Sequence, residues 1–168
     1  MMCARDVLEI VDRLDVACER AWLDGGWGVD ALIGRQTRDH DDLDVVIPLS
    51  EGDVARRTLT TLGFELTEDE ATLCFVAHDA RDRRVDAHTV TLDDEGGALQ
   101  RQEDGTFWRY PPKSFSGLGR VGGREVACLS AEAQVLCHLN YELDEKDRRD
   151  MRLLAEGLGM TLPAPYGP

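Results

Sequence analysis

The stretch Trp22-Leu23-Asp24-Gly25-Gly26-Trp27, followed by Asp42-Leu43-Asp44, decides the fold. Its apolar start predicts a short strand, and the paired glycines predict a tight turn. The residues from Trp27 to Ile33 then predict a short helix, with Gly34 at its C-terminal cap. A second strand is predicted from Asp42 to Ile47, so two strands and a helix frame one acidic pair.

Asp42 and Asp44 are separated by one residue on the second strand. Side chains alternate between the two faces of a strand, so both carboxylates lie on one face. At about 4 Å and an effective dielectric of about 20, their repulsion amounts to about 4 kcal/mol. The basic residues nearby, Arg35 and Arg38, are few beside the local acids. A hard divalent cation, above all Mg²⁺, is the natural partner for this pair, because it takes oxygen ligands from carboxylates and phosphates.

A third acid is predicted on a later strand, from about Arg84 to Thr91. Alternation there places Asp86 and His88 on the face opposite Val85 and Ala87. Three carboxylates on one sheet face can hold one or two metal ions for phosphoryl or nucleotidyl transfer.

The glycine pair and the segment before the acids predict a phosphate site. Gly25 and Gly26 let backbone N–H groups approach a phosphate closely, and the helix that follows adds partial positive charge. Arg38 and His40 precede the acids at the same strand parity, so we expect them to face a triphosphate.

Each of these features also has a plainer interpretation. Gly25-Gly26 alone is typical of an ordinary tight turn, and Asp42 with Asp44 is equally typical of a solvated strand start. Asp86 and His88 alone would be exposed strand residues. The order of all the features together favours a functional site.

The remaining pattern predicts an α+β fold with a mixed or antiparallel sheet and helices on one face. We expect one domain over residues 1–168, with a core from about 1 to 127 and a short C-terminal helical region from about 128 to 160. The polar segment from Asp93 to Gly105 is predicted to be a loop. The predicted helices cover residues 4–20, 27–33, 50–62, 131–140 and 145–158, and the further strands cover 64–67, 72–77, 84–91 and 107–110.

Composition narrows the classes of function. The chain has 168 residues, 42% of them hydrophobic, and no apolar stretch long enough to span a membrane. The five cysteines show no Cys-x-x-Cys spacing, which predicts a reduced, cytoplasmic protein without a zinc site. A formal net charge of −14 argues against a nucleic-acid partner and is compatible with a cationic small-molecule substrate, although it also serves simple solubility.

The glycine pair, the acidic pair and the distant third acid resemble the nucleotidyltransferase superfamily typified by DNA polymerase β. The run from Trp22 to Asp44 more narrowly resembles the antibiotic nucleotidyltransferases of the lincosamide and aminoglycoside 2″ types. The run from Leu129 to Asp147 is similar to the small lincosamide type in particular.

The resemblance implies a role for each matching residue. Asp42, Asp44 and Asp86 would be the metal ligands and catalytic carboxylates, with Asp86 either a ligand or the base for the acceptor hydroxyl. Gly25, Gly26, Arg38 and His40 would bind the nucleotide, whereas we expect Asp30 to be structural. His88, Tyr141 and Glu142 are the predicted substrate contacts.

The predicted activity is Mg²⁺-dependent transfer of AMP from ATP to a hydroxyl of a small antibiotic, with release of pyrophosphate. A lincosamide is the first candidate acceptor and an aminoglycoside the second. Two other classes stay open: a toxin-like enzyme that modifies a protein or RNA, and a nucleotide-binding or antitoxin-like module without turnover. The resemblance is also compatible with a homodimer, and we expect no membrane association.

Overall fold

The computed structural model describes residues 1–18, 20–70, 72–139, 142–164 and 166. Its core is one mixed sheet with the order β3-β4-β5-β2-β1-β9-β8, to which the small hairpin β6–β7 is attached through β5. The strands are β1 (Trp22–Leu23), β2 (Asp42–Pro48), β3 (Phe64–Glu70), β4 (Cys74–Asp79), β5 (Arg84–Leu92), β6 (Ala98–Arg101), β7 (Phe107–Tyr110), β8 (Gly117–Val121) and β9 (Arg124–Cys128). The helices are α1 (Ala4–Ala17), α2 (Gly25–Ile33), the 3₁₀ turn η1 (Leu49–Glu51), α3 (Gly52–Thr61), α4 (Ala131–Cys137) and α5 (Glu145–Leu158).

The centre of the sheet is formed by β2, which has a different neighbour on each side. It pairs antiparallel with β1 and parallel with β5. One face of β2 carries Leu43, Val45 and Ile47, all fully buried against α1, α2 and α3. The other face therefore carries Asp42 and Asp44, and it is the face on which a site can open.

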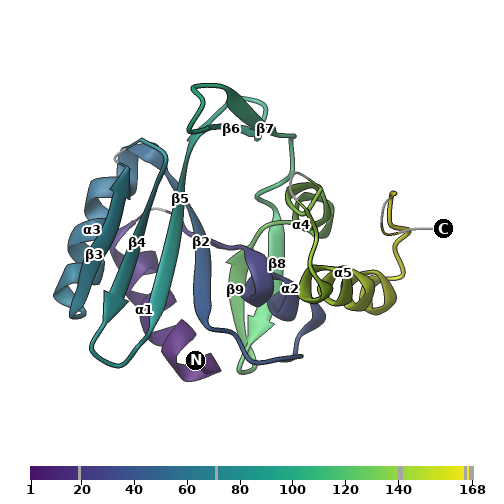
Figure 1. Cartoon of the computed structure of the whole chain (residues 1–168), viewed down its shortest axis with the longest axis horizontal. Coiled ribbons are helices and arrows are strands. Elements are labelled where there is room, and N and C mark those ends of the chain that lie inside the picture. The colour runs from purple at the N-terminus through teal and green to yellow at the C-terminus, as the bar shows by residue number, and fades with distance from the viewer. Residues whose placement is uncertain (19, 71, 140–141, 165, 167–168) are drawn as a thin grey trace.

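The helices confirm the α+β prediction and refine it. The main hydrophobic core lies between the sheet and helices α1, α2 and α3, as expected for helices on one face. Helix α4 differs, because Ala133 packs with Trp22 and Val46 on the other side of the sheet. Helix α5 packs on α2 through Met151 and Leu154, and Figure 1 shows α4 and α5 lying together beyond β8.

Two local predictions were wrong. The segment predicted as a loop from Asp93 to Gly105 contains β6, which pairs with both β5 and β7. The paired glycines do not form a separate turn either, because α2 begins at Gly25 with Asp24 as its N-cap. The C-terminal helix was predicted correctly: Asp144 caps α5 through the Asp147 N–H, and Gly159 ends it in the left-handed conformation.

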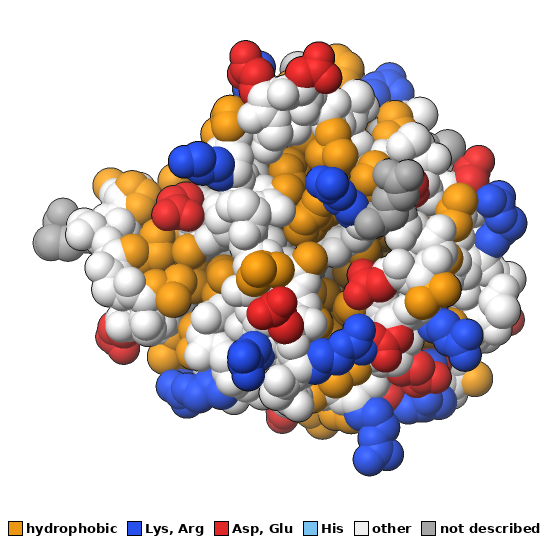
Figure 2. All heavy atoms as spheres, turned by 180° about the vertical axis from the view of Figure 1, so that it is seen from behind, with side chains coloured by type: hydrophobic (Ala, Val, Ile, Leu, Met, Phe, Trp, Pro, Cys, Tyr) orange, Lys and Arg blue, Asp and Glu red, His pale blue; other side chains and the backbone are white. Residues whose placement is uncertain are grey.

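Charged side chains of both signs cover the surface. Figure 2 shows acidic and basic side chains interspersed on one face, with hydrophobic side chains exposed between them. Among the described residues, no helix is both long and apolar enough to cross a bilayer.

Candidate active site

The parallel pairing of β2 with β5 brings the predicted acids together. Asp44 is directly opposite Asp86, and the residue pairs on either side are Asp42 with Arg84 and Val46 with His88. Because paired residues of parallel strands share a face, these five polar side chains project from the same side of the sheet. Strand β4 flanks them with an apolar residue, since Val76 is opposite Asp86.

Asp44 lies where several negative charges meet. Burial raises the pKa of its carboxyl well above the usual value, and the charges of Asp42, Asp24 and Asp86 raise it further. Arg84 is the one group that acts in the other direction among those contributing to this shift. A carboxyl with a raised pKa is destabilised in its charged form, so Asp44 gains from any cation placed beside it.

Asp44, Asp86 and His88 form a group that can bind a metal ion. One ligand atom from each lies within 4.8 Å of the others. Two carboxylate oxygens suit a hard divalent ion such as Mg²⁺ or Mn²⁺ in an open site that leaves room for phosphate oxygens, whereas the imidazole nitrogen is a ligand that Mg²⁺ does not prefer. His88 was predicted as a substrate contact; the structure places it beside the two acids and also in the lining of the adjacent pocket, so that role stays a prediction.

Asp42 is turned toward Arg84 rather than toward this group. The Arg84 guanidinium lies 3.5 Å from Asp42 Oδ2 through Nη1 and 3.2 Å from Asp86 Oδ2 through Nη2. The role of Asp42 as a metal ligand therefore stays a prediction. The sequence interpretation overlooked Arg84 as the cation beside these acids.

Gly25 and Gly26 allow the side chains of Asp44, His40 and Arg38 to lie close to the backbone of α2. Gly25 has a φ of +55°, and a Cβ there would lie 2.1 Å from Asp44 Oδ2. A Cβ at Gly26 would lie 2.4 Å from His40 Nδ1 and 2.6 Å from Arg38 Nη2. The Gly25 N–H donates to Asp24 Oδ1 at 2.7 Å, so this N–H already has a partner within the chain. Binding of a phosphate by these glycines stays a prediction.

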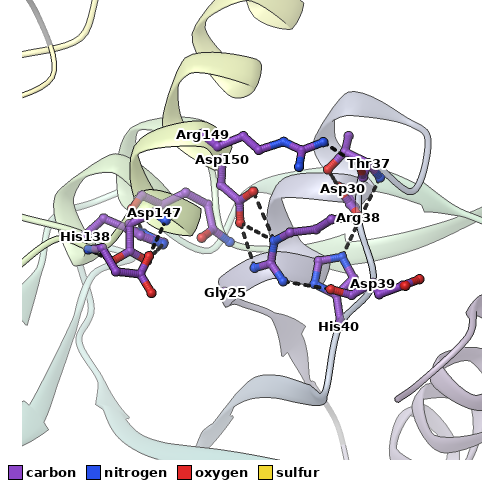
Figure 3. A network of polar contacts seen from close by, with 12 residues as sticks. Gly25, Asp30, Thr37, Arg38, Asp39, His40, His138, Asp147, Arg149 and Asp150 are labelled. Carbon is purple, nitrogen blue, oxygen red and sulfur yellow. Dashed lines mark hydrogen bonds and ion pairs between the residues drawn. The ribbon is translucent and has the colours of Figure 1, made fainter.

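Arg38 and His40 lie beside the glycines, and both are paired within the protein. Arg38 donates from Nε and Nη2 to the buried Asp150 on α5, at 3.0 and 2.8 Å from its Oδ2. His40 is buried with its Nε2 2.6 Å from Asp30 Oδ2, and its ring packs on Trp27. Figure 3 shows Arg38 directed toward Asp150 on α5, with the paired His40 and Asp30 beside it. A nucleotide phosphate would have to share Arg38 with Asp150.

Asp30 is structural, as expected. It is 2% exposed, and besides His40 it accepts hydrogen bonds from the Thr37 N–H at 3.0 Å and the Thr37 hydroxyl at 2.5 Å. These contacts fix the loop between α2 and β2, and with it the position of the Arg38 side chain.

A pocket of about 480 Å³ opens beside the acids. It is lined by Asp24, Gly25 and Asp44 together with residues of β5, the β6–β7 hairpin and the end of α4. The residues that line it are Asp24, Gly25, Asp44, His88, Gln100, Gln102, Thr106, Phe107, Trp108, Tyr110, Cys137 and His138.

The sequence pattern did not predict that the β6–β7 hairpin lines the pocket. Tyr110 donates its hydroxyl to Gln100 Oε1 at 3.0 Å, and Gln100 Nε2 lies 3.4 Å from His88 Nδ1. This chain of contacts joins the aromatic wall to the metal-binding group. The alternation of Gln100 and Gln102 with their neighbours along β6 was the sequence signal for this wall. It is weak unless the strands that pair with β6 are known.

The two predicted contacts after α4 have different outcomes. Tyr141 lies outside the described residues. Glu142 is exposed between α4 and α5 and does not line the pocket. Among the described residues of this region, His138 lines the pocket together with Cys137 at the end of α4.

Known proteins share both this sequence pattern and this fold. A family model described as aminoglycoside-2″-adenylyltransferase matches residues 6–154. A lincosamide resistance protein of Staphylococcus haemolyticus is 29% identical over 150 residues, which cover 89% of this chain and 92% of the relative. A 2″-aminoglycoside nucleotidyltransferase of Klebsiella pneumoniae is 31% identical over 120 residues, or 71% of this chain and 63% of the relative.

Two solved structures are similar over most of their length. The lincosamide antibiotic adenylyltransferase LnuA, bound to lincomycin, has a TM-score of 0.79 at 28% identity, covering 89% of this chain and 94% of that one. ANT(2″)-Ia in complex with adenylyl-2″-tobramycin has a TM-score of 0.73 at 26% identity, covering 93% and 89%. With the family model matching residues 6–154 of 168, the chain belongs to the aminoglycoside-2″-adenylyltransferase family.

Proposed function

We propose that this protein transfers AMP from ATP to a hydroxyl group of a lincosamide antibiotic, with Mg²⁺ as the metal. The observation that carries the proposal is the pocket of about 480 Å³ that opens directly beside Asp44. A hydroxyl held there would lie next to the carboxylates that serve the α-phosphate. Its oxygen would attack the α-phosphorus, and pyrophosphate would leave.

The donor set supports a divalent ion at Asp44 and Asp86. A metal ion bound there would supply Lewis-acid polarisation of the phosphate oxygens. Asp44, with its raised pKa, gains most from that ion. Asp86 has two tasks open to it, as a ligand or as the base that takes the proton of the acceptor hydroxyl.

We expect the triphosphate of the nucleotide to lie on the side of the Asp44 carboxylate that is opposite the pocket. Gly25 and Gly26 are the first two residues of α2, and the partial positive charge at this helix N-terminus favours an anion. Arg38 lies above Gly26, with its guanidinium fixed by Asp150. We propose that these groups orient the triphosphate so that its α-phosphate faces the pocket.

The lining of the pocket favours a lincosamide over an aminoglycoside. Two of the described lining residues, Asp24 and Asp44, are carboxylates, and Asp44 belongs to the metal-binding group. The outer wall is built from amide, hydroxyl and aromatic side chains, among them Gln102, Thr106 and Trp108. A polycation would gain from carboxylates spread along the whole wall, whereas an acceptor with an apolar part and few charges gains from aromatic surfaces.

An aminoglycoside is the second candidate, because two observations favour it. The net charge of −14 would attract a polycation, and the Klebsiella pneumoniae relative is a 2″-aminoglycoside nucleotidyltransferase. The same experiment separates the two acceptors.

The test is mass spectrometry of a panel of lincosamides and aminoglycosides after incubation with the protein, ATP and Mg²⁺. We expect a mass gain of one AMP on a lincosamide, together with release of pyrophosphate. A gain on aminoglycosides alone would replace the first candidate by the second. No gain on any member of either class would contradict the proposed function.

A further inference from the structure

Asp24 is a buried carboxylate in the lining of the pocket, and the proposed reaction gives it no role. It is 8% exposed and lies beside Gly25 and Asp44. The Gly25 N–H donates to Asp24 Oδ1, and none of the described residues donates a hydrogen bond to Oδ2. Asp24 forms no ion pair with a described Lys, Arg or His, unlike the buried Asp150, whose partner is Arg38. A carboxylate buried without a cation is destabilised in its charged form, so it gains from a cationic ligand.

The backbone of Asp24 is fixed on both sides. Its N–H donates to the Asp44 carbonyl at 3.0 Å, and its own carbonyl accepts from the Gly28 N–H at 2.9 Å. Asp24 is therefore held at the junction of β1 and α2, where it is the N-cap of the helix. A group that is already fixed loses little conformational entropy when it binds a ligand.

Aromatic side chains line the same pocket as Asp24. The rings of Trp108 and Tyr110 meet edge to face, with their centroids 6.5 Å apart. Burial raises the pKa of the Tyr110 phenol and of the Cys137 thiol, and the negative charge of Asp24 raises both further, so the carboxylate lies near these two groups. Aromatic rings attract ammonium groups, and a carboxylate adds an ion pair and a hydrogen-bond acceptor. This part of the pocket therefore favours a cation.

Asp44 is the other carboxylate among the described lining residues, but it belongs to the metal-binding group. A divalent ion bound there would neutralise the charge of Asp44 when the enzyme is loaded. Asp24 is not a member of that group, so its charge stays available to the acceptor.

We propose that Asp24 binds a protonated amine of the acceptor in an ammonium subsite whose aromatic walls are Trp108 and Tyr110. The inference rests on the proposed function and adds the chemical group by which the pocket recognises its acceptor. The described lining offers one carboxylate outside the metal-binding group. The acceptor is therefore a hydroxylated compound with one ammonium group beside an apolar part.

The test compares two small probes of the same shape at neutral pH. Trimethylammonium is charged and donates one hydrogen bond, whereas tert-butanol is neutral. Binding of each probe to the nucleotide-free full chain in the presence of Mg²⁺ is followed by NMR titration of the Trp108 indole N–H and the Gly25 N–H. We expect trimethylammonium to bind the wild type about tenfold more tightly than tert-butanol, because only the cation gains the ion pair and the attraction of the rings.

Asp24→Asn removes the charge and keeps the helix cap, because asparagine caps helices about as well as aspartate. We expect the preference for trimethylammonium to fall to about twofold or less in this variant. Glu103→Gln is the matched control, because it removes one negative charge from the exposed turn between β6 and β7, next to the lining residue Gln102. It should keep the wild-type preference. If Asp24→Asn does not fold, Asp24→Ser, which also caps a helix, carries the same expectation.

Equal binding of the two probes to the wild type would overturn the inference, and so would an unchanged preference in Asp24→Asn or Asp24→Ser. An equal loss of preference in Glu103→Gln would assign the effect to net charge and overturn it as well. Transfer of AMP is a separate measurement. Binding of trimethylammonium that depends on Asp24, in a protein that transfers no AMP, would contradict the proposed function and leave the ammonium subsite standing. Transfer with the same KM for an acceptor and for its N-acetylated form would contradict this inference alone.

Discussion

The two sides of the Gly25-Gly26 segment differ in how well their charges are balanced. On the strand side, Asp44 is surrounded by other carboxylates, and its pKa is raised. On the loop side, Asp30 and Asp150 each accept several hydrogen bonds from cationic or polar partners. Removing a carboxylate should therefore affect a different property on each side. The main loss should be in activity at Asp44 and in the free energy of unfolding at Asp30.

The largest effect is expected for Asp44→Asn. The amide cannot bind a divalent ion as a carboxylate does, and the loss of several kcal/mol of transition-state stabilisation corresponds to a fall in AMP transfer of about 1,000-fold or more. The control is Asp41→Asn, which changes an exposed acid three residues earlier and should leave the rate within about twofold. An Asp44→Asn enzyme within tenfold of the wild type would remove Asp44 from the mechanism.

On the loop side, Asp30→Ala should unfold more easily. The change leaves the buried His40 and the half-buried Thr37 donors without their acceptor, which costs about 3 kcal/mol of unfolding free energy. Urea denaturation measures this loss. Asp53→Ala, at an acid whose side chain is 85% exposed, should change the same quantity by less than about 0.5 kcal/mol. Equal stability of the two variants would mean that the loop network does not hold the fold.

Arg38→Lys separates a phosphate contact from a purely structural one. Lysine cannot donate in the forked geometry that Arg38 uses toward Asp150, so we expect a loss of about 2 kcal/mol in unfolding free energy. If Arg38 also binds the triphosphate, KM for ATP rises more in Arg38→Lys than in Asp150→Asn, which keeps the guanidinium. Equal rises in both variants would assign Arg38 to the contact with α5 alone.

The smallest effect is expected at the rim of the pocket. Phe107 is 62% exposed and lines the pocket, so Phe107→Ala should leave stability unchanged. The loss of one aromatic contact, about 1 to 1.5 kcal/mol, should raise KM for the acceptor about tenfold and leave KM for ATP as it was. Leu118→Ala, at a 65% exposed position outside the pocket, is the control and should change neither constant. An unchanged acceptor KM in Phe107→Ala would move the acceptor away from the hairpin.

The strand side could be predicted from the sequence because its signal is local. Alternation along β2 and β5 places Asp42, Asp44, Asp86 and His88 on one face, and the structure has them there. The same parity argument did not extend back to Arg38 and His40. Strand β2 begins only at Asp42, so the residues before it follow the path of a loop.

The other features depend on pairings between distant parts of the chain. Arg38 meets Asp150 across 112 positions, and Arg84 meets Asp42 only because β2 and β5 are neighbours in the sheet. Strand β6 lies in a polar segment that follows Gly96 and Gly97, so its period-2 pattern is weak, whereas β7 was predicted as a strand. These contacts are fixed by topology and side-chain packing, which a single sequence does not reveal.

The central claim is that burial and the neighbouring carboxylates destabilise the charged form of Asp44, and that binding of a divalent ion relieves this destabilisation. Because its pKa is raised in the folded state, its charged form costs stability at pH 7, and this cost disappears as the pH falls below the raised value. Asparagine at this position removes the cost, so the variant should be the more stable of the two in the absence of a divalent ion.

The most direct test is the unfolding free energy of the wild type and of Asp44→Asn at pH 7 over a range of Mg²⁺ concentrations. We expect the two curves to cross: the variant is more stable without Mg²⁺, and the wild type gains stability with Mg²⁺ until it is the more stable of the two. A variant that is less stable at every Mg²⁺ concentration, or that gains as much from Mg²⁺ as the wild type, would contradict the account.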